Sequence, residues 1–154
     1  MIQRKQTIFL FLAFVATVVC LCLPLGSVEL QGMGVEPVLY NLALVQPENN
    51  GVGYNFFYAP LAALLVLAAI LEFTAIFLYK NRKRQARFCS FAIALVFVWL
   101  LLFAYYKYFD LTAVGQLRQN ITAGLPFISA VFDFLAFKGI RADERLVRAA
   151  DRIR

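Results

Sequence analysis

The sequence contains no histidine, one tryptophan and three cysteines in 154 residues. The absence of histidine excludes the imidazole that most often serves as a general base, a metal ligand or a pH sensor near neutrality. Cys20, Cys22 and Cys89 have no histidine or carboxylate beside them in the chain, so a metal site is not indicated. We therefore expect a protein that is not an enzyme and that holds no cofactor or metal.

Catalytic and phosphate-binding motifs are also absent. The chain has no GxxxxGK[ST] loop, no GxGxxG turn, no GxSxG elbow and no HExxH helix. Ser27, Ser90 and Ser129 have no base near them in the sequence that could activate a hydroxyl. These absences leave no reaction class that the sequence favours.

Charged residues are scarce, at 16% of the chain, whereas 62% of the residues are hydrophobic and the mean hydropathy is +0.74. A soluble domain is about half apolar, so this chain has more apolar surface than a water-exposed fold can bury. The sequence therefore predicts an integral membrane protein.

The basic residues give a net charge of +6, which at first resembles a nucleic-acid-binding protein. Their placement indicates otherwise, because they gather at the ends of apolar runs, as membrane-flanking cations do. The densest group is the segment 80–87, KNRKRQAR, in which five residues are basic. We therefore expect no nucleic-acid partner.

Four apolar segments are long enough to cross a bilayer, at about 7–25, 58–79, 88–108 and 121–138. The first follows Arg4 and Lys5, and its 19 residues would span about 28 Å as a helix. It is longer than the apolar core of a signal peptide and lacks a small-x-small cleavage site, so it is interpreted as a membrane anchor.

The basic residues also predict the orientation, because segments rich in Lys and Arg stay on the cytoplasmic side. Only Lys107 and Arg118 of the 15 basic residues would lie outside the cytoplasm if both termini were inside it. The predicted fold is an all-α bundle of four transmembrane helices in the bacterial inner membrane, with cytoplasmic N and C termini. We expect the whole chain, 1–154, to form a single membrane domain.

Three segments lie outside the predicted spans. The external loop 26–57 has no basic residue, and within it Val28–Leu30 could pair with Val38–Val45 as a β-hairpin cap, with an irregular loop as the alternative. The segment 80–87 is predicted to be a cytoplasmic basic loop. The tail 139–154 has apolar residues at three- and four-residue steps, which predicts an amphipathic cytoplasmic helix.

The basic loop and the tail are the candidate docking surface. The tail is interpreted either as an extension of the fourth helix that meets anionic lipid phosphates, or as a docking helix for another protein. Asp143, Glu144 and Asp151 favour docking, because a lipid-binding face has little use for acidic residues. The candidate contacts are Lys80, Arg82, Lys83, Arg84, Arg87, Arg141, Arg145, Arg148 and Arg152.

Glu72 and Asp133 are the ionisable residues inside predicted spans, and an intramembrane carboxyl is a candidate functional group because burying its charge is costly. Counted from Lys80 and Lys138, they lie at similar depths, so they could form a pair that shares a proton or holds a cation. Alternatively, Asp133 reaches Lys138 or the basic loop, and Glu72 bonds to Thr74, a tyrosine or the backbone.

Three stretches carry a resemblance to a known family: the opening Met1–Arg4, the segment Ile76–Cys89, and the ending Lys138–Glu144 with Leu146–Arg154. With these motifs the chain resembles a four-span inner-membrane family of the Bacteroidota catalogued as domain of unknown function 4293. The resemblance covers the full length. It implies a fold class and a cellular location, and it transfers no catalytic residue.

From these observations we expect an accessory or scaffold subunit of a membrane complex, which docks a membrane or cytoplasmic protein through its basic cytoplasmic face. The alternative is a small proton- or cation-coupled transporter or channel that uses Glu72 and Asp133. The first predicts a stoichiometric partner, and the second predicts ion movement by the isolated protein.

Overall fold

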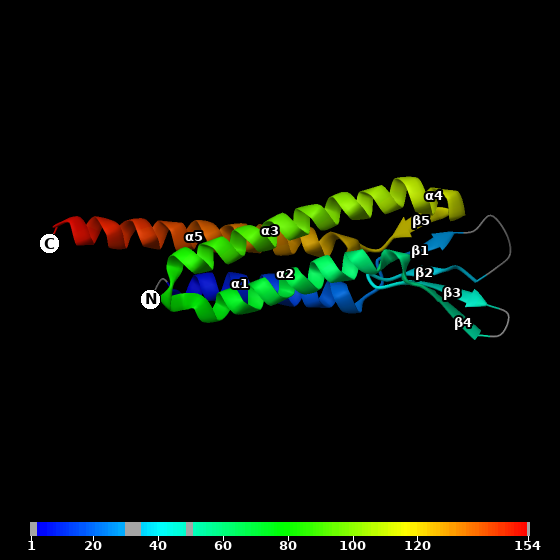
Figure 1. The fold of residues 1–154 in the computed structure, drawn as a ribbon, viewed down its shortest axis with the longest axis horizontal. Helices are drawn as coiled ribbons and strands as arrows, with labels where there is room; N and C mark the ends of the chain where they lie inside the picture. Colours follow the sequence, from blue (N-terminus) through cyan, green and yellow to red (C-terminus); the bar gives the residue numbers. More distant parts are fainter. Residues whose placement is uncertain (1–2, 30–34, 49–50, 154) are drawn as a thin grey trace.

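The computed structural model describes residues 3–29, 35–48 and 51–153. Within these residues, four long helices run side by side and a small β-sheet covers one end of them (Figure 1). The helices are α1 (Gln3–Cys22), α2 (Ala59–Phe77), α3 (Arg82–Tyr105) and α5 (Leu125–Ile153). The chain therefore forms an elongated bundle whose two ends differ: one carries the sheet and the other carries both ends of the chain.

The four helices form a closed ring. α1 packs against α2 and α5, and α3 packs against the same two helices. Many of the buried positions are alanine, and small residues let helix backbones approach closely, as they do in membrane bundles. These buried alanines include Ala13, Ala16, Ala68, Ala69, Ala75, Ala92 and Ala136.

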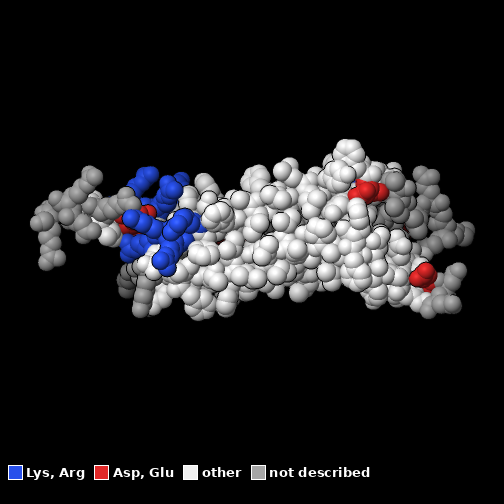
Figure 2. All heavy atoms as spheres, viewed as in Figure 1, with Lys and Arg blue, Asp and Glu red and all other residues white. Residues whose placement is uncertain are grey.

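Large apolar side chains cover the outside of the bundle. Figure 2 shows an uncharged belt between a group of basic residues at one end and acidic residues at the other. A soluble bundle would place polar residues on this outer face. Exposed residues of the belt include Phe11, Val15, Ile70, Phe73, Phe91, Phe97, Leu101, Phe127, Val131 and Phe134.

Three helical stretches are long and apolar enough to cross a membrane: Phe56–Phe77, Arg82–Asp110 and Ile121–Val147. They correspond to the second, third and fourth predicted spans. The apolar part of α1 is shorter, Gln6–Cys22. α1 ends three residues before the predicted end of the first span, because Leu25 already donates its backbone N–H to the carbonyl of Leu39 and leads into the sheet.

The sheet is larger than predicted and corrects the all-α expectation. It has five antiparallel strands in the order β4-β3-β2-β1-β5. The segment 26–57 supplies four of them, and β5 comes from the connection between α3 and α5. The strands are β1 (Gly26–Glu29), β2 (Val38–Leu39), β3 (Leu44–Glu48), β4 (Gly51–Asn55) and β5 (Gln116–Gln119).

The predicted hairpin is correct in one part only. β1 pairs with β2 at the site of the predicted hairpin, but through Gly26 and Ser27, which precede the predicted strand Val28–Leu30. The stretch predicted as one strand, 38–45, folds back so that Val38 pairs with Val45. The backbone N–H of Tyr40 donates to the carbonyl of Ala43 and closes this turn. Gly51–Gly53 lie in β4. Residues 30–34 and 49–50 are outside the described residues.

Two glycines allow β1 and β5 to approach closely. A Cβ atom on Gly26 would overlap the backbone oxygen of Arg118, and one on Gly115 would overlap the backbone oxygen of Glu29. Larger residues at these positions would therefore push the two strands apart. This pairing joins the α1–α2 connection to the α3–α5 connection.

The inner face of the sheet packs onto the bundle. Val28, Leu39 and Leu44 are buried in one cluster with residues of three helices. The sheet thus closes the bundle at this end. The helical members of the cluster include Cys20, Leu61, Leu65, Trp99 and Phe103, together with Tyr106 and Leu111 from the turns that follow α3. Those turns are a π-helical turn, Tyr106–Asp110, and the short α4, Leu111–Val114.

The basic segment 80–87 is mostly helix, which corrects the predicted loop. α2 ends in a 3₁₀ turn, Leu78–Lys80, and α3 already begins at Arg82. The buried side chain of Gln85 donates to the carbonyl of Ala75, and so satisfies a backbone acceptor in the last turn of α2. This contact holds the two helices in a tight antiparallel turn.

α5 runs from Leu125 to Ile153 without a break, after a 3₁₀ turn at Ile121–Gly124. Its 29 residues would span about 44 Å at the usual helical rise, which exceeds the hydrocarbon thickness of a bilayer. The last part of α5 projects past the other helices (Figure 1). The tail 139–154 is therefore continuous with the fourth predicted span up to Ile153.

Candidate functional site

The two predicted intramembrane carboxyls lie next to each other inside the bundle. Glu72 comes from α2 and Asp133 from α5, and both side chains are fully buried. Each carboxyl interacts electrostatically with the other. The structure therefore brings together Glu72 and Asp133, whose similar depths in the sequence analysis had indicated that they could form a pair.

Two hydroxyl groups bind one oxygen of Glu72. Thr17 of α1 donates to Glu72 Oε1 at 3.0 Å, and Ser129 of α5 donates to the same atom at 2.9 Å. The hydroxyls of Thr17 and Ser129 are themselves 2.8 Å apart. Each hydroxyl has one proton, so the three contacts form a small network in which the protons can be rearranged.

The remaining carboxyl oxygens accept no hydrogen bond from a hydroxyl, an amide or a backbone N–H within the described residues, so the hydrogen bond open to them is one between the two carboxyls. These atoms are Glu72 Oε2 and both oxygens of Asp133. Two ionised carboxylates at this position would repel each other strongly in a medium of low dielectric constant. The arrangement is therefore suited to a proton shared between the carboxyls, or to a hard cation bound by carboxyl and hydroxyl oxygens.

The alternative partners considered for these carboxyls are wrong in the described structure. Thr74 donates its hydroxyl to the carbonyl of Leu71 in its own helix and not to Glu72. Asp133 makes no hydrogen bond to Lys138, whose side chain is exposed. The sequence reasoning missed Thr17 altogether and noted Ser129 only as a serine without a base. Their signal was weak: each is a small polar residue in an apolar run.

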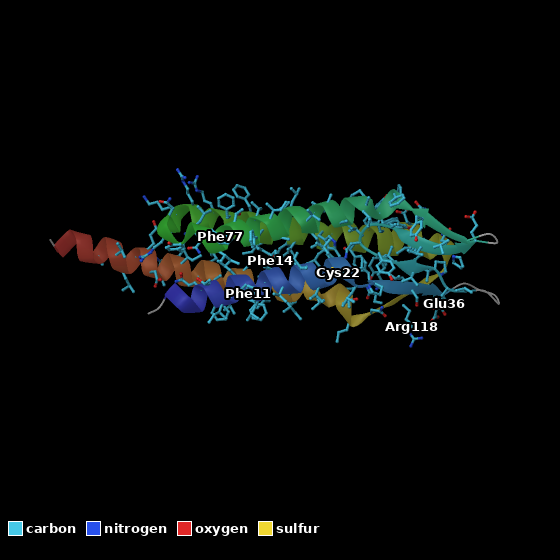
Figure 3. The ribbon with its side chains drawn as sticks, turned by 90° about the horizontal axis from the view of Figure 1, so that it is seen from below. Phe11, Phe14, Cys22, Glu36, Phe77 and Arg118 are labelled. Atoms are coloured by element: carbon cyan, nitrogen blue, oxygen red, sulfur yellow. The ribbon has the colours of Figure 1, made fainter. Side chains whose placement is uncertain are left out.

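A second polar cluster lies at the sheet end of the bundle. Asn41, which is buried, donates to the backbone oxygen of Cys20 at 2.7 Å and accepts a hydrogen bond from Trp99 Nε1 at 3.0 Å. Cys20 and Cys89 are buried, as expected for cysteines that act as packing residues, whereas Cys22 is exposed. Figure 3 shows Cys22 nearer the sheet end, where Glu36 and Arg118 lie, and Phe11, Phe14 and Phe77 along the helices. Asn41 ties the sheet to two helices.

A third polar contact lies at the opposite end. The side chain of Gln6 in α1 donates to Asp143 Oδ2 in α5 at 2.7 Å, and both residues are buried. Arg82 donates to the backbone oxygen of Asp143 at 3.3 Å. Gly139 leaves room for Gln6, since a Cβ atom there would lie 3.1 Å from Gln6 Cγ. The beginning of the tail is therefore fixed to α1 and α3.

The predicted basic residues of α3 and of the tail meet in one pocket. It has a volume of about 630 Å³ and lies between α3 and α5, within the basic group of Figure 2. The lining consists of four cations, one acid, one hydroxyl and two apolar residues. They are Lys83, Ala86, Arg87, Ser90, Phe137, Arg141, Glu144 and Arg145.

The other predicted docking residues lie apart from this pocket or are not described. Arg82 donates a hydrogen bond to the backbone oxygen of Asp143. Arg84, which follows Lys83, has an exposed side chain that does not line the pocket. The side chains of Lys80, Arg148 and Arg152 are outside the described side chains. Of the predicted docking residues, Lys83, Arg87, Arg141 and Arg145 therefore line one pocket.

A family model described as domain of unknown function (DUF4293) matches residues 2–153 of the chain. The chain belongs to the DUF4293 family. The match spans both chain ends and the basic segment that carried the resemblance. A search of curated proteins finds no match. For this DUF4293 protein, the geometry of the carboxyl pair and of the basic pocket therefore carries the functional argument.

Proposed function

We propose that this DUF4293 protein crosses the bacterial inner membrane four times, with both termini in the cytoplasm. Three helices have the required length and hydropathy. α1 is 20 residues long, or about 30 Å, and it packs in the ring beside them with exposed Phe11 and Val15 on its outer face. Most of the described basic residues gather at the end of the bundle that carries both chain ends, in agreement with cytoplasmic retention of cations, whereas Arg118 lies at the sheet end.

The proposed role is that of a non-enzymatic accessory or scaffold subunit of a membrane complex. The observation that carries it is the continuity of α5: the tail leaves the membrane as a rigid helix held by the Gln6–Asp143 contact. Beyond Asp143, Leu146 and Val147 are exposed at 63% and 45% on the projecting part. A helix with exposed apolar residues beside a basic surface is suited to docking a partner protein.

Removal of Leu146–Arg154 tests this role, because it deletes the projecting part and keeps Asp143 and the residues of the basic pocket. The full chain, extracted in mild detergent from its native membrane, is expected to carry a stoichiometric partner that the shortened chain lacks. Arg118→Gln, at the sheet end, is the matched control and should keep the partner. A partner retained by the shortened chain, or no partner on the full chain, contradicts the role.

A second function is favoured by the buried carboxyl pair: passage of protons or small cations. Glu72, Asp133, Thr17 and Ser129 place six side-chain oxygens together, from three helices. The purified protein in liposomes would then move an ion unaided, and Glu72→Gln would abolish the movement. Thr74→Val is the control, because the Thr74 hydroxyl bonds only within its own helix turn among the described contacts. Equal flux in protein-free liposomes contradicts this function.

A further inference from the structure

The basic pocket lies where the charged end of the bundle meets the apolar belt. On α3, Lys83 and Arg87 precede the apolar run that begins at Phe88, and Ser90 lies within that run. From Lys83 to Ser90 the pocket extends about 10 Å along the helix. A pocket at this level, in a chain that crosses the membrane, lies at the depth of lipid headgroups.

The lining offers donors suited to phosphate. Lys83, Arg87, Arg141 and Arg145 face one carboxyl, that of Glu144, so the lining side chains carry a net charge of +3. Guanidinium groups bind phosphate oxygens with paired N–H donors. The guanidinium of Arg141 lies over the ring of Phe137, 4.9 Å from its centroid. Such stacking leaves the N–H edge of an arginine able to donate.

The two sides of the pocket continue into apolar surface in the direction of the belt. On α3, Phe91 follows Arg87 by four residues, and on α5, Phe134 precedes Phe137 by three, so each lies on the same helix face as a lining residue. Both phenylalanines are exposed, at 63% and 54%. A ligand with a charged head and apolar chains fits this sequence of surfaces, whereas a free phosphate would use only the charged part.

We propose that this pocket binds the phosphate headgroup of an anionic membrane phospholipid, with the acyl chains lying along α3 and α5 beside Phe91 and Phe134. Lys83, Arg87, Arg141 and Arg145 bind the phosphate oxygens, and Ser90 donates its hydroxyl from the membrane side. The site is independent of the projecting part of α5, because every lining residue precedes Leu146. A bound lipid would add a fixed negative group between α3 and α5 at the cytoplasmic surface.

The test is native mass spectrometry of the full chain released from nanodiscs of phosphatidylglycerol and phosphatidylcholine in equal amounts. The unaltered protein should retain phosphatidylglycerol preferentially. The double variant Arg87→Gln, Arg141→Gln should retain it less by about tenfold or more, because each loses a charge-assisted hydrogen bond. The control is Arg84→Gln, Arg118→Gln, which makes the same change of charge outside the pocket and should retain the lipid as the unaltered protein does.

Three results would overturn the proposal. Equal loss in both double variants would mean that lipid is held by diffuse charge and not by the pocket. No preference for phosphatidylglycerol in the unaltered protein would exclude an anionic headgroup. Displacement of the lipid by millimolar inorganic phosphate, with phosphate then bound in its place, would assign the pocket to the free anion. The unfolding temperatures of both double variants verify that the bundle is intact. If the variant Arg87→Gln, Arg141→Gln does not fold, the double variant Lys83→Gln, Arg145→Gln provides a second test of the pocket.

The docking role of the projecting part of α5 and lipid binding in the pocket can be disproved independently of each other. The chain without Leu146–Arg154 keeps the whole pocket and should still retain phosphatidylglycerol even though it loses its partner protein. Conversely, the variant Arg87→Gln, Arg141→Gln keeps the projecting part of α5, so partner binding can be measured on it directly. Loss of lipid from the shortened chain would contradict the independence of the pocket.

Discussion

Gln6, near the beginning of the chain, donates a buried hydrogen bond of 2.7 Å to Asp143, near its end. The contact joins α1 to α5 at the end of the bundle where the basic residues gather. It also explains why an acidic residue lies in a basic tail: Asp143 faces inward, toward α1, and not outward toward a partner or lipid. The sequence analysis took Asp143 as one of three acidic residues that favour docking, and its buried position removes that argument for Asp143.

Replacing Gln6 with alanine should destabilise the bundle by about 1–3 kcal/mol, because it leaves the buried Asp143 carboxyl without its side-chain donor. Unfolding in detergent, followed by circular dichroism, measures the change. Gln116→Ala in β5 removes the same amide from an exposed position and should change stability by less than about 0.5 kcal/mol. Equal effects of the two variants would contradict a structural role for the Gln6–Asp143 contact.

The hydroxyl network around Glu72 should behave as a unit. Thr17→Val and Ser129→Ala each remove one donor to Glu72 Oε1 and should each cost about 1–2 kcal/mol. The two hydroxyls also contact each other, so the double variant should differ from the sum of the singles by about 0.5 kcal/mol or more. Unfolding free energies of the three variants give this coupling. Thr74→Val is the control, and exact additivity of Thr17→Val with Ser129→Ala would contradict the network.

The junction between sheet and bundle can be followed through the one tryptophan of the chain. Trp99 is fully buried and donates to Asn41, so its fluorescence should be blue-shifted in the folded protein. Asn41→Ala removes the acceptor of Trp99 and the donor to Cys20, and it should cost roughly 1–3 kcal/mol and change the emission wavelength, because the indole N–H loses its partner. Asn55→Ala, at an exposed position, should leave the emission unchanged. An unchanged spectrum in Asn41→Ala would refute the link.

The proposed orientation predicts which residues a membrane-impermeant thiol reagent reaches in intact cells with a permeabilised outer membrane. In a background without the native cysteines, Val52→Cys in β4 should be labelled from outside. Arg145→Cys should be labelled only after the inner membrane is opened. Both positions are exposed, so reactivity reports sidedness and not burial. If Arg145→Cys were labelled before the inner membrane is opened and Val52→Cys were not, the orientation of the chain would be the opposite of the proposed one.

The helices and their basic end could be predicted because hydropathy and charge are strong local signals that extend over about 20 residues. The proximity of Glu72 and Asp133 could also be predicted, because depth along a helix follows from residue counting. Their partners Thr17 and Ser129 could not, since the choice of helix face depends on the packing of all four helices. A single threonine in an apolar run has no spacing that would reveal it.

The five-stranded sheet was not predicted for a different reason. β2 has two residues and β5 has four, and strands this short have almost no periodicity of their own. β5 is also polar, with the sequence QLRQ, and pairs with β1, which lies far away in the chain. The basic segment 80–87 was predicted to be a loop because its charge separates two apolar runs, whereas the residue at which a helix begins gives only a weak signal in the sequence. Asn81, before Arg82, is a residue type that often begins a helix, although its side chain makes no capping bond to α3 in the structure.

α5 has a mechanical consequence. Asp133 and the projecting residues share one rod with no hinge between them, and from Asp133 to Ile153 this rod is about 30 Å long. A change of tilt at the carboxyl pair that also releases Asp143 from Gln6 and Arg82 would therefore displace the far tip sideways by a larger distance. A spectroscopic probe attached near that tip would then report a change at the buried carboxyl pair.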